Sequence, residues 1–187
     1  MPPELQRLLD EIAAAEADAR ALAASLTDAQ ANWQPGGGTG WSVAQCLDHL
    51  ALSNSAYTSH FLPVAERARG AGPTPFTGLA PTAIGRWFVG TLEPPPRRKI
   101  KTFEKLVPPS SMPLADALAA YVGSHDPYRR LVALAAELDP NRVVAANPFL
   151  GWVRMRLSTA LLVVPAHDRR HLWQARRVVE APGFPRS

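Results

Sequence analysis

The residues with the clearest chemical potential are two histidines near the C-terminus, His167 and His171, which stand four positions apart. On a helix this spacing places both imidazoles on one face about one turn apart, close enough to coordinate a single ion. The zincin pattern His-Glu-x-x-His, with its general base, is absent, because Asp168 follows the first histidine. The pair alone is also typical of polar residues on a partly exposed helical turn. It therefore indicates a metal site only together with a further ligand.

A third histidine, His49, belongs to an earlier amphipathic segment. It shares one helical face with residues at steps of four, four, three and four, namely Ser53, Tyr57, His60 and Val64. We expect this face to point into the core, where three histidines without partners would be costly. A shared metal ion would satisfy them, and three neutral imidazoles with an open position are typical of a reactive zinc site. Imidazole ligands favour Zn or Ni over Mg, which prefers oxygen.

Other side chains on these helices have weaker chemical interpretations. Tyr57 could orient a bound ligand, and His125 could act as an acid or base, because the unperturbed pKa of histidine is about 6.5. Both residues also suit ordinary core positions. Cys46, the single cysteine, is interpreted as a small buried hydrophobic residue rather than a catalytic thiol. Asp48 and Asp168 are the nearest carboxylates that could hold an imidazole tautomer, although such residues more often make solvated or capping contacts.

The histidines depend on four amphipathic segments that must fold as helices. Apolar residues at three- and four-residue steps predict helices over residues 4–31, 42–69, 113–138 and 158–180. Ser42 with Gln45 three residues later forms the pattern of a capping box, and Pro63 and Pro127 predict local kinks. No segment shows a convincing strand pattern. We therefore predict an all-α fold, a four-helix bundle with a long crossover between helices 2 and 3.

The crossover, residues 70–111, is rich in proline and glycine but also contains aromatic residues. Only residues 82–92 are suited to a short helix. Because the segment is too long and too aromatic for a simple disordered linker, we expect it to pack and to form one wall of a cavity. The glycines from Gly36 to Gly38 lack the following Gly-Lys-Ser/Thr of a phosphate-binding loop and are interpreted as a helix connection.

The composition excludes several classes of protein. The chain has 187 residues, of which 47% are apolar and 19% charged, as is typical of a globular domain. One cysteine excludes a disulfide framework, and no apolar run reaches the roughly 18 residues that span a bilayer. The net charge of +4 is modest, and the basic residues are not interleaved with aromatic ones, which argues against nucleic-acid binding. The length of the chain suits one domain, which we expect over residues 1–187. Because the N-terminus lacks a signal-peptide pattern, we expect the protein to be soluble and cytoplasmic.

Two segments carry a resemblance to a known family. Residues 40–50, from Gly40 to Leu50, resemble the second-helix motif of the DinB-like superfamily, and residues 165–174 resemble its last-helix motif. The resemblance covers essentially the whole chain. It implies a four-helix bundle with a crossover, homodimerisation, and a divalent metal held by one histidine of the second helix and two of the last. Carried over by position, these ligands are His49, His167 and His171.

The resemblance implies more than one activity. Some members conjugate low-molecular-weight thiols such as bacillithiol or mycothiol to electrophiles, others are isomerases acting with a thiol, and many have no known activity. We expect a metal-dependent transferase that uses a thiol cosubstrate and a small-molecule substrate. Arg170, or the run from Arg97 to Lys99, would give the site a basic lip for an anionic cosubstrate. Two alternatives remain open, namely a metal-dependent hydrolase with the same triad and a non-enzymatic, stress-related metal-binding bundle.

Overall fold

The computed structural model describes residues 1–72, 74–96 and 102–186, and helices dominate these ranges. In chain order the elements are α1 (Pro3–Ala24), α2 (Asp28–Ala31), α3 (Pro35–Gly38), α4 (Val43–Gly70), α5 (Ala83–Leu92), the 3-10 helix η1 (Glu104–Leu106), α6 (Leu114–Gly123), α7 (His125–Ala135), β1 (Val144–Ala146), β2 (Arg154–Arg156) and α8 (Leu157–Val179). Within the described ranges, no helix combines the length and the apolar character needed to cross a bilayer.

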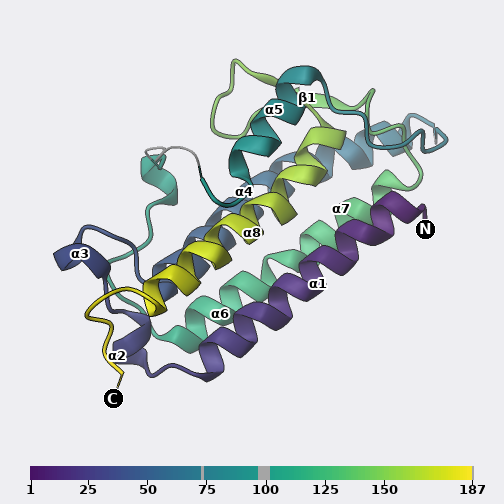
Figure 1. The fold of residues 1–187 in the computed structure, drawn as a ribbon. Coiled ribbons are helices and arrows are strands. Elements are labelled where there is room, and N and C mark those ends of the chain that lie inside the picture. Colours follow the sequence, from purple (N-terminus) through teal and green to yellow (C-terminus); the bar gives the residue numbers. More distant parts are fainter. Residues whose placement is uncertain (73, 97–101, 187) are drawn as a thin grey trace.

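The long helices form a four-membered bundle in which α6 and α7 together make up one member (Figure 1). Helix α4 packs against α8 on one side and against α6 and α7 on the other, and α1 closes the ring by packing against α8, α6 and α7. Helices α4 and α6 begin at the same end of the bundle (Figure 1). The chain between them therefore has to return along the bundle. The predicted all-α four-helix bundle is confirmed.

Helix α4 begins at the capping box that the sequence predicts. The backbone N–H of Gln45 donates to Ser42 Oγ at 3.2 Å, and the backbone N–H of Ser42 donates to Gln45 Oε1 at 3.0 Å. The Gln45 amide also donates to the carbonyl of Pro109 at 3.0 Å, so the start of α4 is tied to the crossover. The helix continues through Pro63 to Gly70. These contacts position the face of α4 that carries His49.

The first predicted helix is divided in the structure. Helix α1 ends at Ala24, and α2 is a separate turn that begins after Thr27. The hydroxyl of Thr27 accepts from the backbone N–H of Gln30 at 3.3 Å, and this cap restarts the helix. The prediction of one helix to residue 31 was wrong because this second capping box lies inside an otherwise helical pattern.

The third predicted helix is also divided, at Ser124, into α6 and α7. The break lies just before Pro127, which has no N–H to donate to the carbonyl four residues earlier. The hydroxyl of Ser124 donates to the carbonyl of Tyr121 at 2.6 Å and so satisfies one backbone group at the break. The expected interruption is present, but it lies upstream of the proline rather than at it.

A small hairpin interrupts the otherwise helical chain before α8. Strands β1 and β2 pair antiparallel, with Ala145 opposite Met155 and both side chains buried. The sequence did not predict these strands, because each is three residues long and too short to show an alternating pattern. The loop between them carries Phe149, whose ring lies 5.4 Å from that of Tyr57.

Helix α5, which was expected over residues 82–92, packs against α8. Thr82 caps it by accepting from the backbone N–H of Gly85 at 3.1 Å. A Cβ at Gly85 would lie 2.6 Å from Thr159 Oγ1, a distance that real Cβ atoms do not show. Glycine at this position therefore allows α5 to approach α8 closely enough to cover the face that carries the histidine pair.

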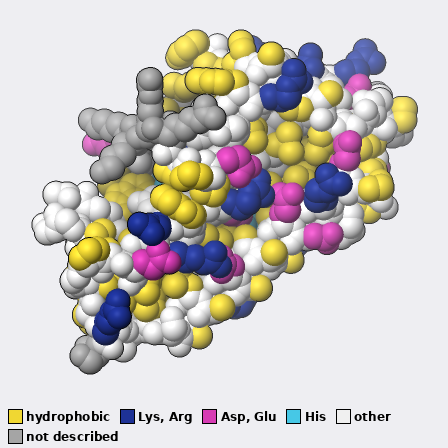
Figure 2. All heavy atoms as spheres, in the orientation of Figure 1, with side chains coloured by type: hydrophobic (Ala, Val, Ile, Leu, Met, Phe, Trp, Pro, Cys, Tyr) yellow, Lys and Arg dark blue, Asp and Glu magenta, His cyan; other side chains and the backbone are white. Residues whose placement is uncertain are grey.

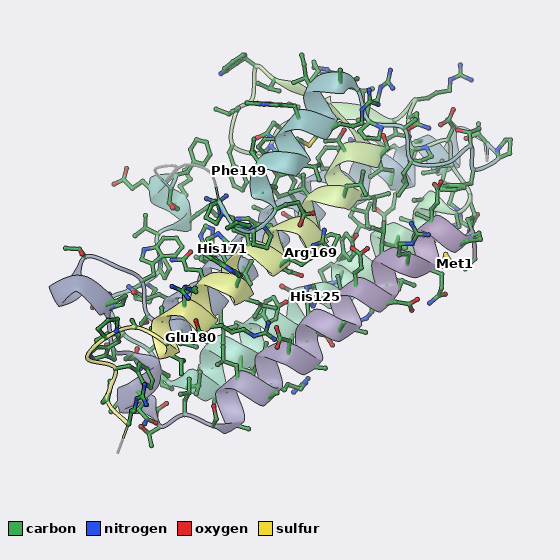
Figure 3. The ribbon with its side chains drawn as sticks, in the orientation of Figure 1. Met1, His125, Phe149, Arg169, His171 and Glu180 are labelled. Atoms are coloured by element: carbon green, nitrogen blue, oxygen red, sulfur yellow. The ribbon has the colours of Figure 1, made fainter. Side chains whose placement is uncertain are left out.

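The bundle core contains a buried polar network that joins side chains of α1, α4, α7 and α8. His125 Nε2 lies 2.9 Å from Asp168 Oδ2, and His125 Nδ1 lies 2.8 Å from Glu16 Oε1. The Asn54 amide donates to Asp168 Oδ1 at 3.1 Å. Burial opposes a charge on the His125 ring, but its hydrogen bonds to Asp168 and Glu16 and their charges outweigh burial, so the pKa of His125 is raised. In Figure 3, His125 and His171 lie on opposite sides of α8.

Basic and acidic side chains are interspersed on the face of the molecule drawn in Figure 2. Arg169 illustrates this arrangement, because its guanidinium contacts Glu11 at 2.7 Å and Glu93 at 2.5 Å. The basic run from Arg97 to Lys99 lies outside the described residues. On this face the positive charge is not gathered into one broad patch.

We predict that His125→Ala lowers the free energy of unfolding by about 3–5 kcal/mol, because one member of the buried His125–Asp168 pair would be removed and Asp168 would be left without it. The matched control is Asp126→Ala, which removes a side chain that is 81% exposed. This control should change the free energy by less than about 1 kcal/mol. Urea denaturation of the metal-free protein, followed by circular dichroism at neutral pH, measures both values. Equal effects of the two substitutions would contradict a structural role for the network.

Candidate metal centre

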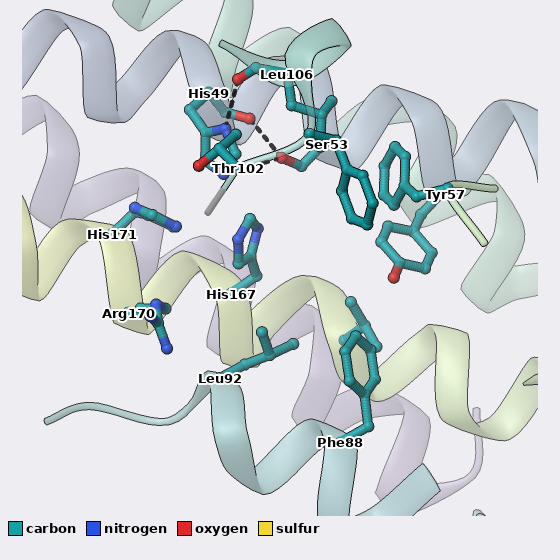
Figure 4. A pocket seen from close by; sticks show the side chains of 13 residues that line it. His49, Ser53, Tyr57, Phe88, Leu92, Thr102, Leu106, His167, Arg170 and His171 are labelled. Carbon is teal, nitrogen blue, oxygen red and sulfur yellow. Dashed lines mark hydrogen bonds between the residues drawn. The ribbon is translucent and has the colours of Figure 1, made fainter. Parts of the chain in front are cut away.

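The structure brings His49, His167 and His171 together between α4 and α8 (Figure 4). One ring nitrogen from each residue lies within 4.8 Å of those of the other two. The ring centroids are 4.5 Å apart for His49 and His171, 4.5 Å for His167 and His171, and 5.1 Å for His49 and His167. His49 and His171 are buried, and His167 is half-buried. Three such rings could hold a single metal ion.

Surrounding groups fix the orientation of two of the rings. His49 Nδ1 lies 2.8 Å from the carbonyl oxygen of Leu106, so the ring donates from Nδ1 and leaves Nε2 available as a ligand. The indole of Trp41 packs against both rings, with centroid distances of 4.7 Å to His49 and 5.7 Å to His171. The Nδ1 atom of His171 is buried and has no hydrogen-bond partner among the described residues.

Burial keeps the three imidazoles neutral. It is the largest cause that lowers the pKa of each ring, and the charge of Arg170 lowers all three further. The pKa of His171 falls to about 3, and that of His167 is well below its usual value. Metal-ligating histidine must be neutral. The unpartnered nitrogen of His171 and this uncharged donor set therefore fit a divalent ion of borderline softness.

The triad borders a cavity of about 150 Å³. Its other walls come from α4, α5, α8, the crossover and the β1–β2 loop, through Ser53, Tyr57, Phe88, Leu92, Thr102, Phe103, Leu106, Phe149, Val163 and Arg170. The crossover contributes five of these residues, in and after α5, which confirms that it forms one wall. The cavity therefore has a polar end at the histidines and an apolar end formed largely by aromatic side chains (Figure 4).

The structure separates the other candidates suggested by the sequence. Tyr57 and Arg170 line the cavity, whereas His125 is not among its lining residues. Burial raises the pKa of Tyr57 to about 12, with opposition from the amide of Asn147, so its hydroxyl stays protonated at neutral pH. Cys46 is fully buried in an apolar cluster, and burial raises the pKa of its thiol. This placement agrees with the interpretation of Cys46 as a packing residue.

One functional group at the centre was not predicted from the sequence. The group that orients His49 is the backbone carbonyl of Leu106 rather than Asp48 or Asp168. Asp168 instead contacts His125 in the bundle core. A backbone carbonyl carries no side-chain signature, so only the path of the crossover could have revealed this contact.

The helical bundle and the three neutral histidines beside one cavity indicate the class of this protein, an all-α bundle with a candidate metal centre. A sequence model of the DinB superfamily matches residues 11–175, and the chain belongs to this superfamily. The superfamily is typically metal-binding. The chain matches no curated protein and no solved structure at a significant level.

We predict that the purified wild-type protein contains about one equivalent of a divalent metal per chain. Loss of a group that only hydrogen-bonds to a metal ligand lowers metal affinity by up to roughly 100-fold. His171→Ala removes a direct ligand, so it should lower the affinity for zinc by more than this. Elemental analysis and competition with a chelator measure these quantities. His60→Ala is the control, since His60 lies on α4 outside the cavity lining. Absence of stoichiometric metal, or an equal loss in the control, would contradict the site.

We also predict that zinc affinity stays nearly level as the pH falls from 8 through about 6.5, the ordinary pKa of histidine. Protons and metal compete for the same nitrogens. Because the pKa of each ring is lowered, protons compete effectively only in more acidic solution. Chelator competition across this pH range measures the effect. A steep loss of affinity beginning at about pH 6.5 would show that the rings are not held neutral by burial.

Proposed function

We propose that the protein is a metal-dependent transferase that conjugates a low-molecular-weight thiol to a small electrophile. His49, His167 and His171 would hold the metal, with Zn or Ni as the ions best suited to imidazole. The observation that carries the proposal is the neutral histidine triad at one end of a largely apolar cavity. Such a site offers a place for a polar thiol beside a place for an apolar electrophile.

A bound divalent ion would supply Lewis acidity, which lowers the pKa of a thiol that reaches it or, in a hydrolase, of a water molecule. In the transfer, the thiolate sulfur forms a bond to an electrophilic carbon while the leaving group departs with its electron pair. The thiol proton passes to solvent. The contribution of the chain is to bring both reactants together in one cavity.

The cavity walls are suited to hold the electrophile. Phe88 and Phe149 provide apolar surface for its body, and the ring of Phe149 stacks on that of Phe103 at 5.4 Å. The protonated hydroxyl of Tyr57 can donate a hydrogen bond to a polar atom of the substrate, whereas it cannot act as a base at neutral pH. Tyr57 is therefore proposed as an orienting residue and not as the group that removes a proton.

A hydrolase with the same triad is the second candidate. His167 is half-buried, so water can reach the histidine end of the cavity. The two activities differ in whether turnover needs a thiol, and a direct assay separates them.

We predict that the zinc-loaded protein accelerates the reaction of bacillithiol, mycothiol or glutathione with chlorodinitrobenzene. His49→Ala should reduce the rate to the uncatalysed background, because one ligand is lost, and His60→Ala should retain it. Absorbance of the conjugate measures the rate. A parallel series with nitrophenyl esters and no thiol tests the hydrolase. Ester turnover that is independent of thiol would replace the transferase proposal, and tight metal binding without any turnover would favour a non-enzymatic bundle.

Other expectations extend this proposal beyond the site. We propose that the whole chain acts as one domain, in the cytoplasm, on a small-molecule substrate. We also propose homodimerisation, which only the family resemblance supports. Sedimentation equilibrium of the full chain would measure its oligomeric state directly.

A further inference from the structure

Two neighbouring arginines on α8 have opposite environments. Arg169 is neutralised by two carboxylates, those of Glu11 and Glu93. Arg170 instead lines the cavity and donates from Nη1 to the carbonyl oxygen of Thr91 at 2.8 Å. Among the described residues, no carboxylate pairs with Arg170. The cavity therefore contains a cation whose remaining N–H groups have no acidic partner in this part of the chain.

Among the described residues, the cavity lining carries a positive charge that no acidic side chain balances. No Asp or Glu occurs among the described residues that line it. Histidine binds a metal as a neutral ligand, so a divalent ion held by the three rings would keep its full charge, and Arg170 would add one more. A half-buried cation beside apolar walls is costly unless an anion accompanies it. The missing negative charge would have to arrive with a ligand.

The volume and the walls of the cavity limit the size of that ligand. A cavity of about 150 Å³ is small, and an apolar cavity of similar volume in another protein accommodates benzene. The walls opposite the histidines come from Phe88, Leu92 and Phe149. They fit an apolar group of about the size of one aromatic ring.

We propose that Arg170 is a substrate-binding residue that recognises a carboxylate at the polar end of the cavity, while the apolar body of the electrophile occupies the aromatic end. The guanidinium suits this role because its planar donors match a carboxylate in bidentate geometry. The proposal deepens the proposed function by naming the substrate class, and it rests on that function only in calling the ligand a substrate. The carboxylate can belong to the electrophile or to the thiol, and the experiment distinguishes the two sources.

Benzoate and benzamide form the first probe pair, because they share a ring and differ in charge. Isothermal titration of the full-length protein, metal-free and zinc-loaded, should show benzoate binding more tightly than benzamide. Arg170→Gln should weaken benzoate binding by roughly tenfold or more in both forms and leave benzamide unchanged. The metal-free form matters because benzoate cannot then bind through zinc. Arg170→Lys should retain part of the affinity, since it keeps the charge but loses the fork of donors.

The control variant is Arg177→Gln, on the same helix, where the side chain is 63% exposed and pairs with Glu180. It should bind benzoate as the wild type does. Melting curves of all variants, measured by circular dichroism, show whether each is folded. If Arg170→Gln is not folded, two other comparisons test whether Arg170 binds a carboxylate. One is benzoate binding by Arg170→Lys and by wild type, and the other is the difference between benzoate and benzamide binding in wild type.

The second probe pair, N-acetylcysteine and its amide, carries the charge on the thiol. If Arg170→Gln removes the preference for benzoate, the carboxylate belongs to the electrophile. If it removes only the preference for N-acetylcysteine over the amide in the zinc-loaded protein, the carboxylate belongs to the thiol. Unchanged affinities for both anions in Arg170→Gln, or equal binding of charged and neutral probes to wild type, would overturn the proposal. Carboxylate binding without any thiol transfer would contradict the proposed function alone.

Discussion

The orientation of α8 depends on Asp168, a fully buried carboxylate between the two histidines of that helix. Its oxygens are held by His125 at 2.9 Å and by Asn54 at 3.1 Å. Rotation of α8 about its axis would break both contacts and leave a buried carboxylate without partners, which is very costly. Because helical residues follow each other at a fixed angle of about 100°, a fixed direction for Asp168 also fixes the directions of both histidines. The candidate metal centre therefore depends on a buried network that does not itself contact the three histidines.

The crossover supplies the second constraint on the centre. Its Leu106 carbonyl accepts from His49 Nδ1, and its Pro109 carbonyl accepts from the amide of Gln45 at the start of α4. Helix α5 approaches α8 closely at Gly85 and brings Phe88 to the cavity. The same segment thus orients a ligand and forms the apolar wall. This double role explains why a proline-rich connection of such length packs against the bundle.

The features that follow from local spacing could be predicted from the sequence. The capping box at Ser42 gives the start of α4, and a step of four residues places His167 and His171 on one face. Contacts between distant segments could not be predicted in the same way. The carbonyl of Leu106 has no side-chain signature. An apolar stripe does not show which neighbour it faces, so the sequence could not tell whether His125 lies in the core or at the cavity. Strands β1 and β2 are too short for an alternating pattern to stand out.

The proposed chemistry requires the cavity to be positively charged and free of its own acids. Neutral ligands leave the charge of a metal undiminished, and Arg170 adds to it, so the site is suited to anions such as a thiolate or a carboxylate. The neighbouring Arg169 differs from Arg170, because the charge of Arg169 is already balanced by Glu11 and Glu93. Both arginines lie beside the histidine pair, yet only one faces the ligand space.

X-ray absorption spectroscopy at the zinc edge of the zinc-loaded full-length protein tests the central claim most directly, because it counts the ligands of the bound ion. The account predicts three imidazole nitrogens at about 2.0–2.1 Å and, in the absence of added thiol, no sulfur ligand. Fewer than three imidazoles, or a sulfur ligand from Cys46, would contradict it.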